Sequence, residues 1–146
     1  MTVSDGGPGQ EAQNDPQGLR GAFEYQASKG LPEGSQKSFD EMKAAGLPVT
    51  ISDWEILLSV YARAGLPDDA QRTFHAMTAE TATASEVAWQ ALLIANARAG
   101  KSVGAQRAFD AMTDAGVSPD DRCWRTLLNA YVKAGDLDGS VRTALA

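Results

Sequence analysis

Apolar residues recur along the chain with the spacing of one face of an α-helix. One such face is formed by Trp54, Leu57, Leu58 and Tyr61, at positions i, i+3, i+4 and i+7. A second face follows it and is formed by Ala70, Phe74 and Met77. No segment alternates between apolar and polar residues over a useful length, so strands are not expected. The pattern predicts an all-α protein built from pairs of helices.

These helix pairs repeat every 35 residues. The period is marked by four residue types, at Trp54, Trp89 and Trp124, at Gly30, Gly65, Gly100 and Gly135, at Phe39, Phe74 and Phe109, and at Met42, Met77 and Met112. The segments that begin at the tryptophans are similar, namely WEILLSVYARAG, WQALLIANARAG and WRTLLNAYVKAG, and residues 19–30 are a more divergent copy. One pair cannot bury its apolar face alone. We therefore expect successive pairs to stack into a right-handed solenoid with the Trp, Phe and Met columns in its core.

Local signals predict where the helices begin and end. Ser52 and Glu55 have the form of a capping box, which places a helix start near Asp53. Gly65 ends that helix because glycine adopts a left-handed conformation at low cost, and Pro67 suits the first turn of the next. The first helices of the pairs are predicted over 53–64, 88–99 and 123–134, and the second helices over 68–79, 103–115 and 137–145, with a further pair over 19–28 and 33–45.

The period also sets the domain organisation. The repeats span 16–50, 51–85 and 86–120, and an incomplete repeat spans 121–146. Residues 1–15 contain Gly, Pro, Gln and acidic residues but no basic residue, so their composition is that of neither a secretory signal nor an organelle transit peptide. We expect this segment to be a disordered leader.

Composition and charge narrow the function classes. A hydrophobic content of 43% predicts a folded core, whereas a net charge of −6 argues against binding nucleic acid through bulk positive charge. No apolar run is long enough to span a membrane. Cys123 and His75 are the one cysteine and the one histidine, so neither a disulfide nor a Cys/His metal site is expected. Without a phosphate-binding loop or a nucleophile elbow, the sequence predicts no enzyme, cofactor, metal or small-molecule substrate.

The repeat unit resembles the pentatricopeptide repeat (PPR) family. The family's marks are an aromatic first residue, a Leu-Leu pair, a basic-Ala-Gly turn, then Ala, Phe and Met, and a closing Gly-x-x-Pro-Asp. The turn is present as Arg63-Ala64-Gly65, Arg98-Ala99-Gly100 and Lys133-Ala134-Gly135. The later marks are present as Phe109, Met112 and Gly116-Val117-Ser118-Pro119-Asp120. The tetratricopeptide repeat fits less well, because its period is 34 residues and it has a small residue where Leu58, Leu93 and Leu128 stand.

The resemblance covers residues 16–146 and implies binding of single-stranded RNA in a chloroplast or mitochondrion, in RNA processing, stability or translation. In such arrays each repeat addresses one base along the concave face. Carried onto this sequence, the base-facing residues would be Arg20, Thr50, Ser52, Glu55, Ser85, Val87, Gln90, Asp120, Arg122 and Arg125. The phosphate-facing residues would be Arg63, Arg98 and Lys133.

Two functional hypotheses remain open. The first is the RNA-binding module, supported by the phased Arg63, Arg98 and Lys133, which could instead complement the negative ends of the helix dipoles. The second is an acidic scaffold that binds other proteins and no RNA. A further basic column, at Lys37, Arg72, Arg107 and Arg142, lies in the second helices and is expected to form a solvated surface row.

Overall fold

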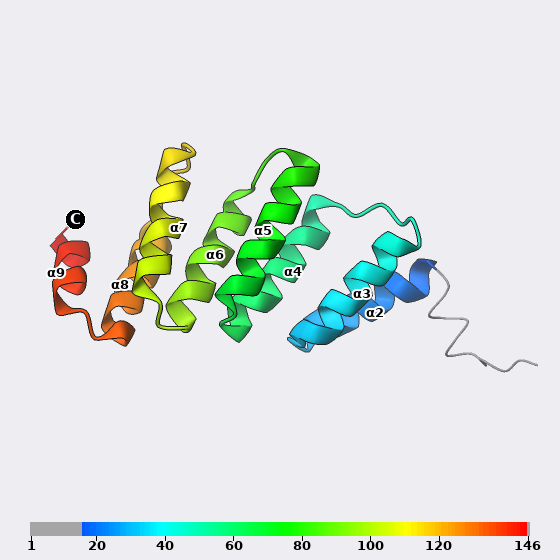
Figure 1. Cartoon of the computed structure of the whole chain (residues 1–146), viewed down its shortest axis with the longest axis horizontal. Coiled ribbons are helices and arrows are strands. Elements are labelled where there is room, and N and C mark those ends of the chain that lie inside the picture. Colours follow the sequence, from blue (N-terminus) through cyan, green and yellow to red (C-terminus); the bar gives the residue numbers. More distant parts are fainter. Residues whose placement is uncertain (1–15, 146) are drawn as a thin grey trace, which may run out of the picture. The chain divides into compact units, whose positions relative to one another are not determined.

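The computed structural model describes residues 16–145, so the leader predicted over 1–15 lies outside the described residues (Figure 1). Eight helices and no strand lie in the described range. The helices are α2 (Pro16–Ser28), α3 (Pro32–Ala44), α4 (Ile51–Ala64), α5 (Pro67–Thr81), α6 (Glu86–Arg98), α7 (Ser102–Asp114), α8 (Asp121–Ala134) and α9 (Leu137–Leu145). The chain divides into two compact units, up to Val60 and from Tyr61 onward, and the division falls inside α4.

The core of the first unit is a row of three aromatic rings. The ring of Phe39 on α3 lies between Phe23 on α2, at a centroid distance of 5.7 Å, and Trp54 on α4, at 4.7 Å. All three side chains are buried, and Phe39 is only 1% exposed. Phe39 and Trp54 belong to the phased columns, whereas Phe23 belongs to the divergent copy of the repeat. Each helix of the unit therefore contributes one ring to a continuous apolar contact.

In the second unit the same contact recurs between successive helix pairs. Phe74 on α5 lies 4.6 Å from Trp89 on α6, and Phe109 on α7 lies 4.6 Å from Trp124 on α8, between ring centroids. Helix α6 packs against α5, α7 and α8, and α8 packs against α7 and α9. The phased methionines Met77 and Met112 are buried, while Trp89 and Trp124 are half-buried. The predicted core position is thus confirmed for the phased phenylalanines and methionines, whereas Trp89 and Trp124 contact the preceding repeat but keep part of their surface exposed.

Helices α4, α6 and α8 begin two residues earlier than predicted, and at α4 the capping pair differs from the predicted one. The backbone N–H of Asp53 donates to Thr50 Oγ1 at 3.2 Å, and the N–H of Thr50 donates to Asp53 Oδ2 at 2.9 Å. The prediction that Ser52 and Glu55 form the capping box is therefore wrong, and Thr50 and Asp53 form the reciprocal pair. Side chains of Ser85 and Asp120 accept from the backbone N–H groups of α6 and α8 in the same way.

The turn after α4 follows the prediction. Gly65 has a φ of 68°, the left-handed conformation that a Cβ would strain. The N–H of Leu66 donates to the carbonyl of Tyr61 at 3.0 Å, and the N–H of Gly65 donates to that of Ala62 at 3.1 Å. These bonds satisfy carbonyls left unpaired at the helix end. Pro67 then opens α5, where its fixed φ and missing N–H have no cost.

An ion pair links α2 to the start of α4 in the first unit. Nη1 of Arg20 donates to Asp53 Oδ1 at 2.7 Å, and the Asp53 side chain is only 5% exposed. Burial alone raises the pKa of Asp53, but hydrogen bonds from Arg20 and from the Thr50 N–H outweigh it and hold the pKa below its ordinary value.

We expect Asp53→Asn to lower the free energy of unfolding by about 1.5–3 kcal/mol at pH 7, because a charge-assisted hydrogen bond is lost. A carboxyl whose pKa is lower when folded stabilises the fold above its unfolded pKa of about 3.9, and this contribution disappears as the pH falls through the folded pKa. The free energies of unfolding of the wild type and Asp53→Asn, measured with urea at several pH values, should therefore become equal at acidic pH. Glu41→Gln, on the exposed side of α3, is the control and should change little at any pH. A constant difference down to pH 2 would contradict the role given to the carboxylate.

Candidate functional site

The candidate base-facing residues gather at the beginnings of the first helices. Thr50, Ser85 and Asp120 stand immediately before α4, α6 and α8. Ser52, Val87 and Arg122 are the second residues of these helices, and Glu55, Gln90 and Arg125 are the fifth. Because residues three apart lie on the same side of a helix, each helix presents its second and fifth side chains together. Arg20 is likewise the fifth residue of α2.

The residues before the helices all act as N-caps. Ser85 Oγ accepts from the N–H of Ala88 at 3.2 Å, and Asp120 Oδ1 accepts from the N–H of Cys123 at 3.0 Å. The backbone hydrogen bond from Cys123 holds the pKa of Asp120 below its ordinary value, so the carboxylate is charged at neutral pH. The Cys123 side chain is buried, which raises the pKa of its thiol. Capping therefore fixes the direction of each side chain at the helix start.

The second and fifth positions differ in their access to solvent. Ser52, Val87 and Arg122 are exposed, as is Arg125. Glu55 and Gln90 are half-buried. Nε2 of Gln90 donates to Glu86 Oε1 one turn earlier, at 3.3 Å. In the second unit α6 and α8 pack together, so their two sets of side chains lie on neighbouring helices.

Arg20 differs from the other candidates because its guanidinium already forms two hydrogen bonds within the protein. Besides its ion pair with Asp53, its Nη2 donates to the carbonyl of Pro48 at 3.2 Å. The guanidinium is therefore held against the start of α4. Asp53 was not among the residues predicted from the sequence, although its position three residues after Thr50 is the signal of a capping acid at this point.

The candidate phosphate-facing residues form what we call the basic column, Arg63, Arg98 and Lys133. All three are exposed and stand at the C-terminal ends of α4, α6 and α8, inside the second unit. Arg98 lies over the turn of the preceding repeat, where a Cβ added to Gly65 would be 3.4 Å from its Cβ. Lys133 lies over the next turn, where a Cβ on Gly100 would be 3.6 Å from its Cγ. The column residues are thus placed by contacts between successive repeats.

Lys133 also contributes to the end of the neighbouring helix. Its Nζ donates to the carbonyl of Arg98, the last residue of α6, at 2.6 Å. A cation at this place satisfies an unpaired carbonyl and complements the negative end of the helix dipole. One member of the column therefore has a structural role in addition to any contact with a ligand.

Two structural features are absent from residues 16–145. No helix there is both long enough and apolar enough to cross a membrane. In the same range, no group of three or more His, Cys, Asp or Glu side chains is arranged to hold a metal ion.

Comparison with known proteins finds related repeats. The sequence model of the pentacotripeptide-repeat region of PRORP matches residues 25–144. The crystal structure of the pentatricopeptide repeat protein PPR10 from maize is similar with a TM-score of 0.77 and 18% identity, over 89% of this chain and 19% of that chain. Two structures of PPR10 in complex with an 18-nt psaJ RNA element each give a TM-score of 0.70 and 23% identity, over 76% of this chain and 16% of that chain.

At these identities the likeness shows the fold, and the predicted all-α helical-repeat solenoid is confirmed. The chain spans less than a fifth of the length of the PPR10 structures that it matches. No curated protein matches it.

Proposed function

Because the chain belongs to the pentatricopeptide repeat family, whose sequence model covers residues 25–144, we propose that it is a single-stranded RNA-binding module. PPR10, which shares its fold, has been solved with an RNA element bound. The observation that carries the proposal is the basic column, Arg63, Arg98 and Lys133, which recurs with the repeat on exposed helix ends. A row of cations at the repeat spacing is suited to the evenly spaced phosphates of a single strand.

In this proposal the two ends of the first helices contact different parts of the RNA. The basic column contacts phosphates and positions the strand, while the side chains at the helix starts face the bases. The base-facing side chains are those of the residues before α4, α6 and α8 and of their second and fifth residues, together with Arg20. Family membership supports a place in a chloroplast or mitochondrion, in RNA processing, stability or translation. The module binds RNA and does not act as an enzyme.

A salt series tests the proposal directly. The affinity of the wild-type protein for single-stranded RNA oligonucleotides is measured between roughly 50 and 200 mM salt. Contacts with phosphates release counterions, so log affinity should fall linearly with log salt, by about 0.7 per phosphate contacted. Absence of binding at the lowest salt, or a flat dependence, would refute the proposal.

Substitutions at the helix starts test the base-facing role. Glu55→Asn should strengthen binding to all sequences, because it removes a half-buried carboxylate from beside an anionic strand. Gln90→Asn, beside Asp120, should introduce a preference among homopolymers, because this pair would then match the family's usual type. Affinities for a panel of oligonucleotides measure both effects.

Asp114→Asn is the matched control for Glu55→Asn, because it makes the same charge change on an exposed position of α7. If both substitutions strengthen binding equally, net charge explains the effect and Glu55 has no special position. A Gln90→Asn protein with the wild-type order of preferences would remove Gln90 from the base-facing set.

The alternative function is an acidic scaffold that binds other proteins. It is favoured by the net charge of −6 and by the internal hydrogen bonds that Arg20 and Lys133 already make. In this case the partner would present a basic surface, since opposite charges favour association. The salt series separates the two functions, because a scaffold would not bind RNA even at low salt.

A further inference from the structure

One column of the repeat changes from tyrosine to asparagine in the middle of the second unit. The seventh residue after each tryptophan is Tyr61, Asn96 or Tyr131. Tyr131 on α8 and Asn96 on α6 both lie in the second unit, each between the second helices of two successive repeats. Their surroundings can therefore be compared residue by residue.

Tyr131 fills its place completely. The side chain is 5% exposed, and its hydroxyl donates to Gln106 Oε1 on α7. The ring covers Gly139 on α9 so closely that a Cβ there would collide with it. Arg142 on α9 lies 6.0 Å from the ring centroid, in the range of a cation–π contact. An acceptor, a glycine and an arginine thus surround one phenol ring.

The same three partners surround Asn96. Gln71 on α5, Gly104 on α7 and Arg107 on α7 stand 35 residues before Gln106, Gly139 and Arg142. The Asn96 amide covers Gly104, where a Cβ would collide with it, and donates to the carbonyl of Leu92 at 2.9 Å. Asparagine has neither the ring nor the hydroxyl of tyrosine. The residues that surround the phenol ring of Tyr131 thus have counterparts around Asn96, but the phenol ring itself has none.

The two glutamines are also held in the same way. Nε2 of Gln106 donates to Asp110 Oδ1 one turn later at 2.9 Å, which turns its Oε1 towards Tyr131. Nε2 of Gln71 lies 2.9 Å from His75 Nε2, also one turn later. With the amide nitrogen donating to His75 Nε2, Oε1 of Gln71 is left as the acceptor. No described residue donates to that oxygen.

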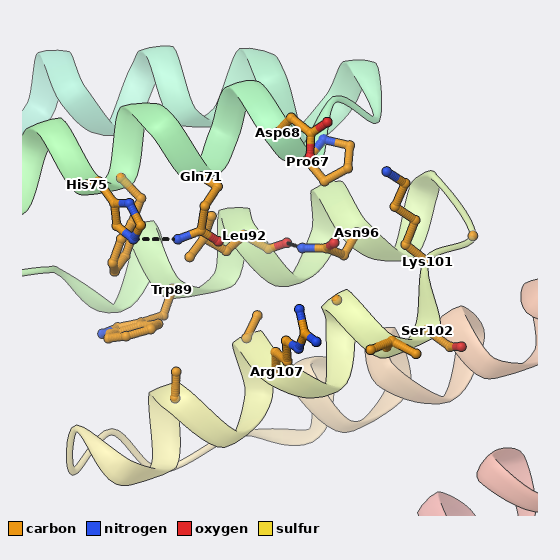
Figure 2. A pocket seen from close by; sticks show the side chains of 16 residues that line it. Pro67, Asp68, Gln71, His75, Trp89, Leu92, Asn96, Lys101, Ser102 and Arg107 are labelled. Carbon is orange, nitrogen blue, oxygen red and sulfur yellow. Dashed lines mark hydrogen bonds between the residues drawn. The ribbon is translucent and has the colours of Figure 1, made fainter.

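A cavity of about 810 Å³ lies at this place. Figure 2 shows Gln71 and His75 on α5 on one side, Arg107 on α7 on the other side, and Asn96 and Leu92 on α6 between them. Trp89 and Leu92 on α6, together with Phe74 on α5, give it an apolar wall. Its volume is within the range of small-ligand pockets, and the mixture of apolar walls with a few convergent polar groups is typical of them.

We infer that this cavity, named here the Asn96 cavity, binds a phenol ring supplied by a ligand. The hydroxyl of the ligand donates to Gln71 Oε1, and the ring lies beside Asn96 and Leu92 with the Arg107 guanidinium near its face, as Arg142 lies near Tyr131. The cavity lies between the second helices α5 and α7 and the first helix α6, and none of the proposed base-facing residues or basic-column residues lines it, so this inference is independent of RNA binding.

A titration followed by NMR tests the inference with p-cresol, the phenol that corresponds to a tyrosine side chain. We expect saturable shifts of the Trp89 indole and the Gly104 amide. Toluene should bind about fivefold more weakly, because it lacks the hydrogen bond to Gln71. Equal affinities for p-cresol and toluene, or no saturable shifts with p-cresol, would overturn the inference.

Two variants locate the site. Asn96→Tyr should fill the cavity from within, raise the melting temperature and weaken p-cresol binding at least tenfold. Gln71→Met should bring p-cresol and toluene to the same affinity, and it carries the test if Asn96→Tyr does not fold. Gln36→Met, the same change one repeat earlier, is the control and should leave p-cresol binding unchanged. Wild-type p-cresol binding by folded Asn96→Tyr would overturn the inference.

The origin of the ring can be distinguished with N-acetyl-tyrosinamide. If it binds more tightly than p-cresol, the ring belongs to a tyrosine of a peptide chain. If it binds more weakly, the ligand is a free small phenol. Both results support the cavity as a phenol site, whereas equal binding of N-acetyl-tyrosinamide and N-acetyl-phenylalaninamide would overturn the role of Gln71.

Discussion

Replacing Phe39 with alanine is expected to lower the free energy of unfolding by about 3–5 kcal/mol, the largest change expected of a single substitution in this chain. Phe39 is 1% exposed, and its ring contacts Phe23 on one side and Trp54 on the other. Its loss removes buried apolar surface, leaves a cavity between three helices and breaks two aromatic contacts at once.

Urea unfolding followed by circular dichroism measures this change. Tyr25→Ala is the matched control, because it also truncates an aromatic ring in the first unit, at a position on α2 that is 60% exposed. It should change stability by no more than about 0.5 kcal/mol. Should Phe39→Ala not fold, Phe39→Leu gives a smaller and measurable loss. A loss below about 1 kcal/mol for Phe39→Ala would show that the aromatic row is not the core of this unit.

Most of the fold could be predicted from the sequence, because the same 35-residue pattern recurs in each repeat and predicts the same helix pair each time. The 35-residue spacing of Trp, Phe and Met specifies which faces meet, and the structure joins them through the Phe74–Trp89 and Phe109–Trp124 contacts. The periodicity predicted every described helix, with ends within a few residues. Repetition makes such a prediction strong, since an error in one copy is corrected by the others.

The helix starts were harder to predict because two capping patterns overlap. Ser52 with Glu55 has the commoner form of a capping box, whereas Thr50 with Asp53 uses a shorter acid. Arg20 favours the second choice, because its ion pair with Asp53 holds the carboxylate where it accepts from the Thr50 N–H. This partner lies 33 residues away, in the divergent copy, where the period gives no guide to side-chain pairing.

The sequence shows the change from tyrosine to asparagine at position 96, but it does not show that this change leaves a cavity. The segments WEILLSVY and WRTLLNAY end in tyrosine and WQALLIAN ends in asparagine, and this change alone predicts only a smaller side chain. Its effect depends on Gln71 and Arg107, which the structure brings beside Asn96 from two other helices. The basic column, by contrast, was predicted from its phase alone, and the turns at Gly65 and Gly100 explain how it is placed.

The largest functional effect is expected from removing that column. Changing Arg63, Arg98 and Lys133 together to alanine should lower the salt slope of RNA binding by about two units, at about 0.7 per phosphate contact. The same contacts imply an affinity loss of about 100-fold near 0.1 M salt, similar for all RNA sequences because phosphates carry no base identity. Among the single variants, Lys133→Ala should have a smaller effect than Arg98→Ala, since Lys133 Nζ already donates to the carbonyl of Arg98.

A second triple variant separates position from charge. Lys37, Arg72 and Arg142 belong to the second helices, are exposed, and give the same charge change when replaced by alanine. Arg72 is paired with Asp69 on its own helix, so its loss should be tolerated. If phosphates follow the ends of the first helices, this control keeps the wild-type slope, because charges further than a Debye length of about 10 Å from the strand are screened. Equal loss of slope in both triple variants would mean that RNA is attracted by the total charge of the protein, and the basic column would then be only a set of helix ends complemented by cations.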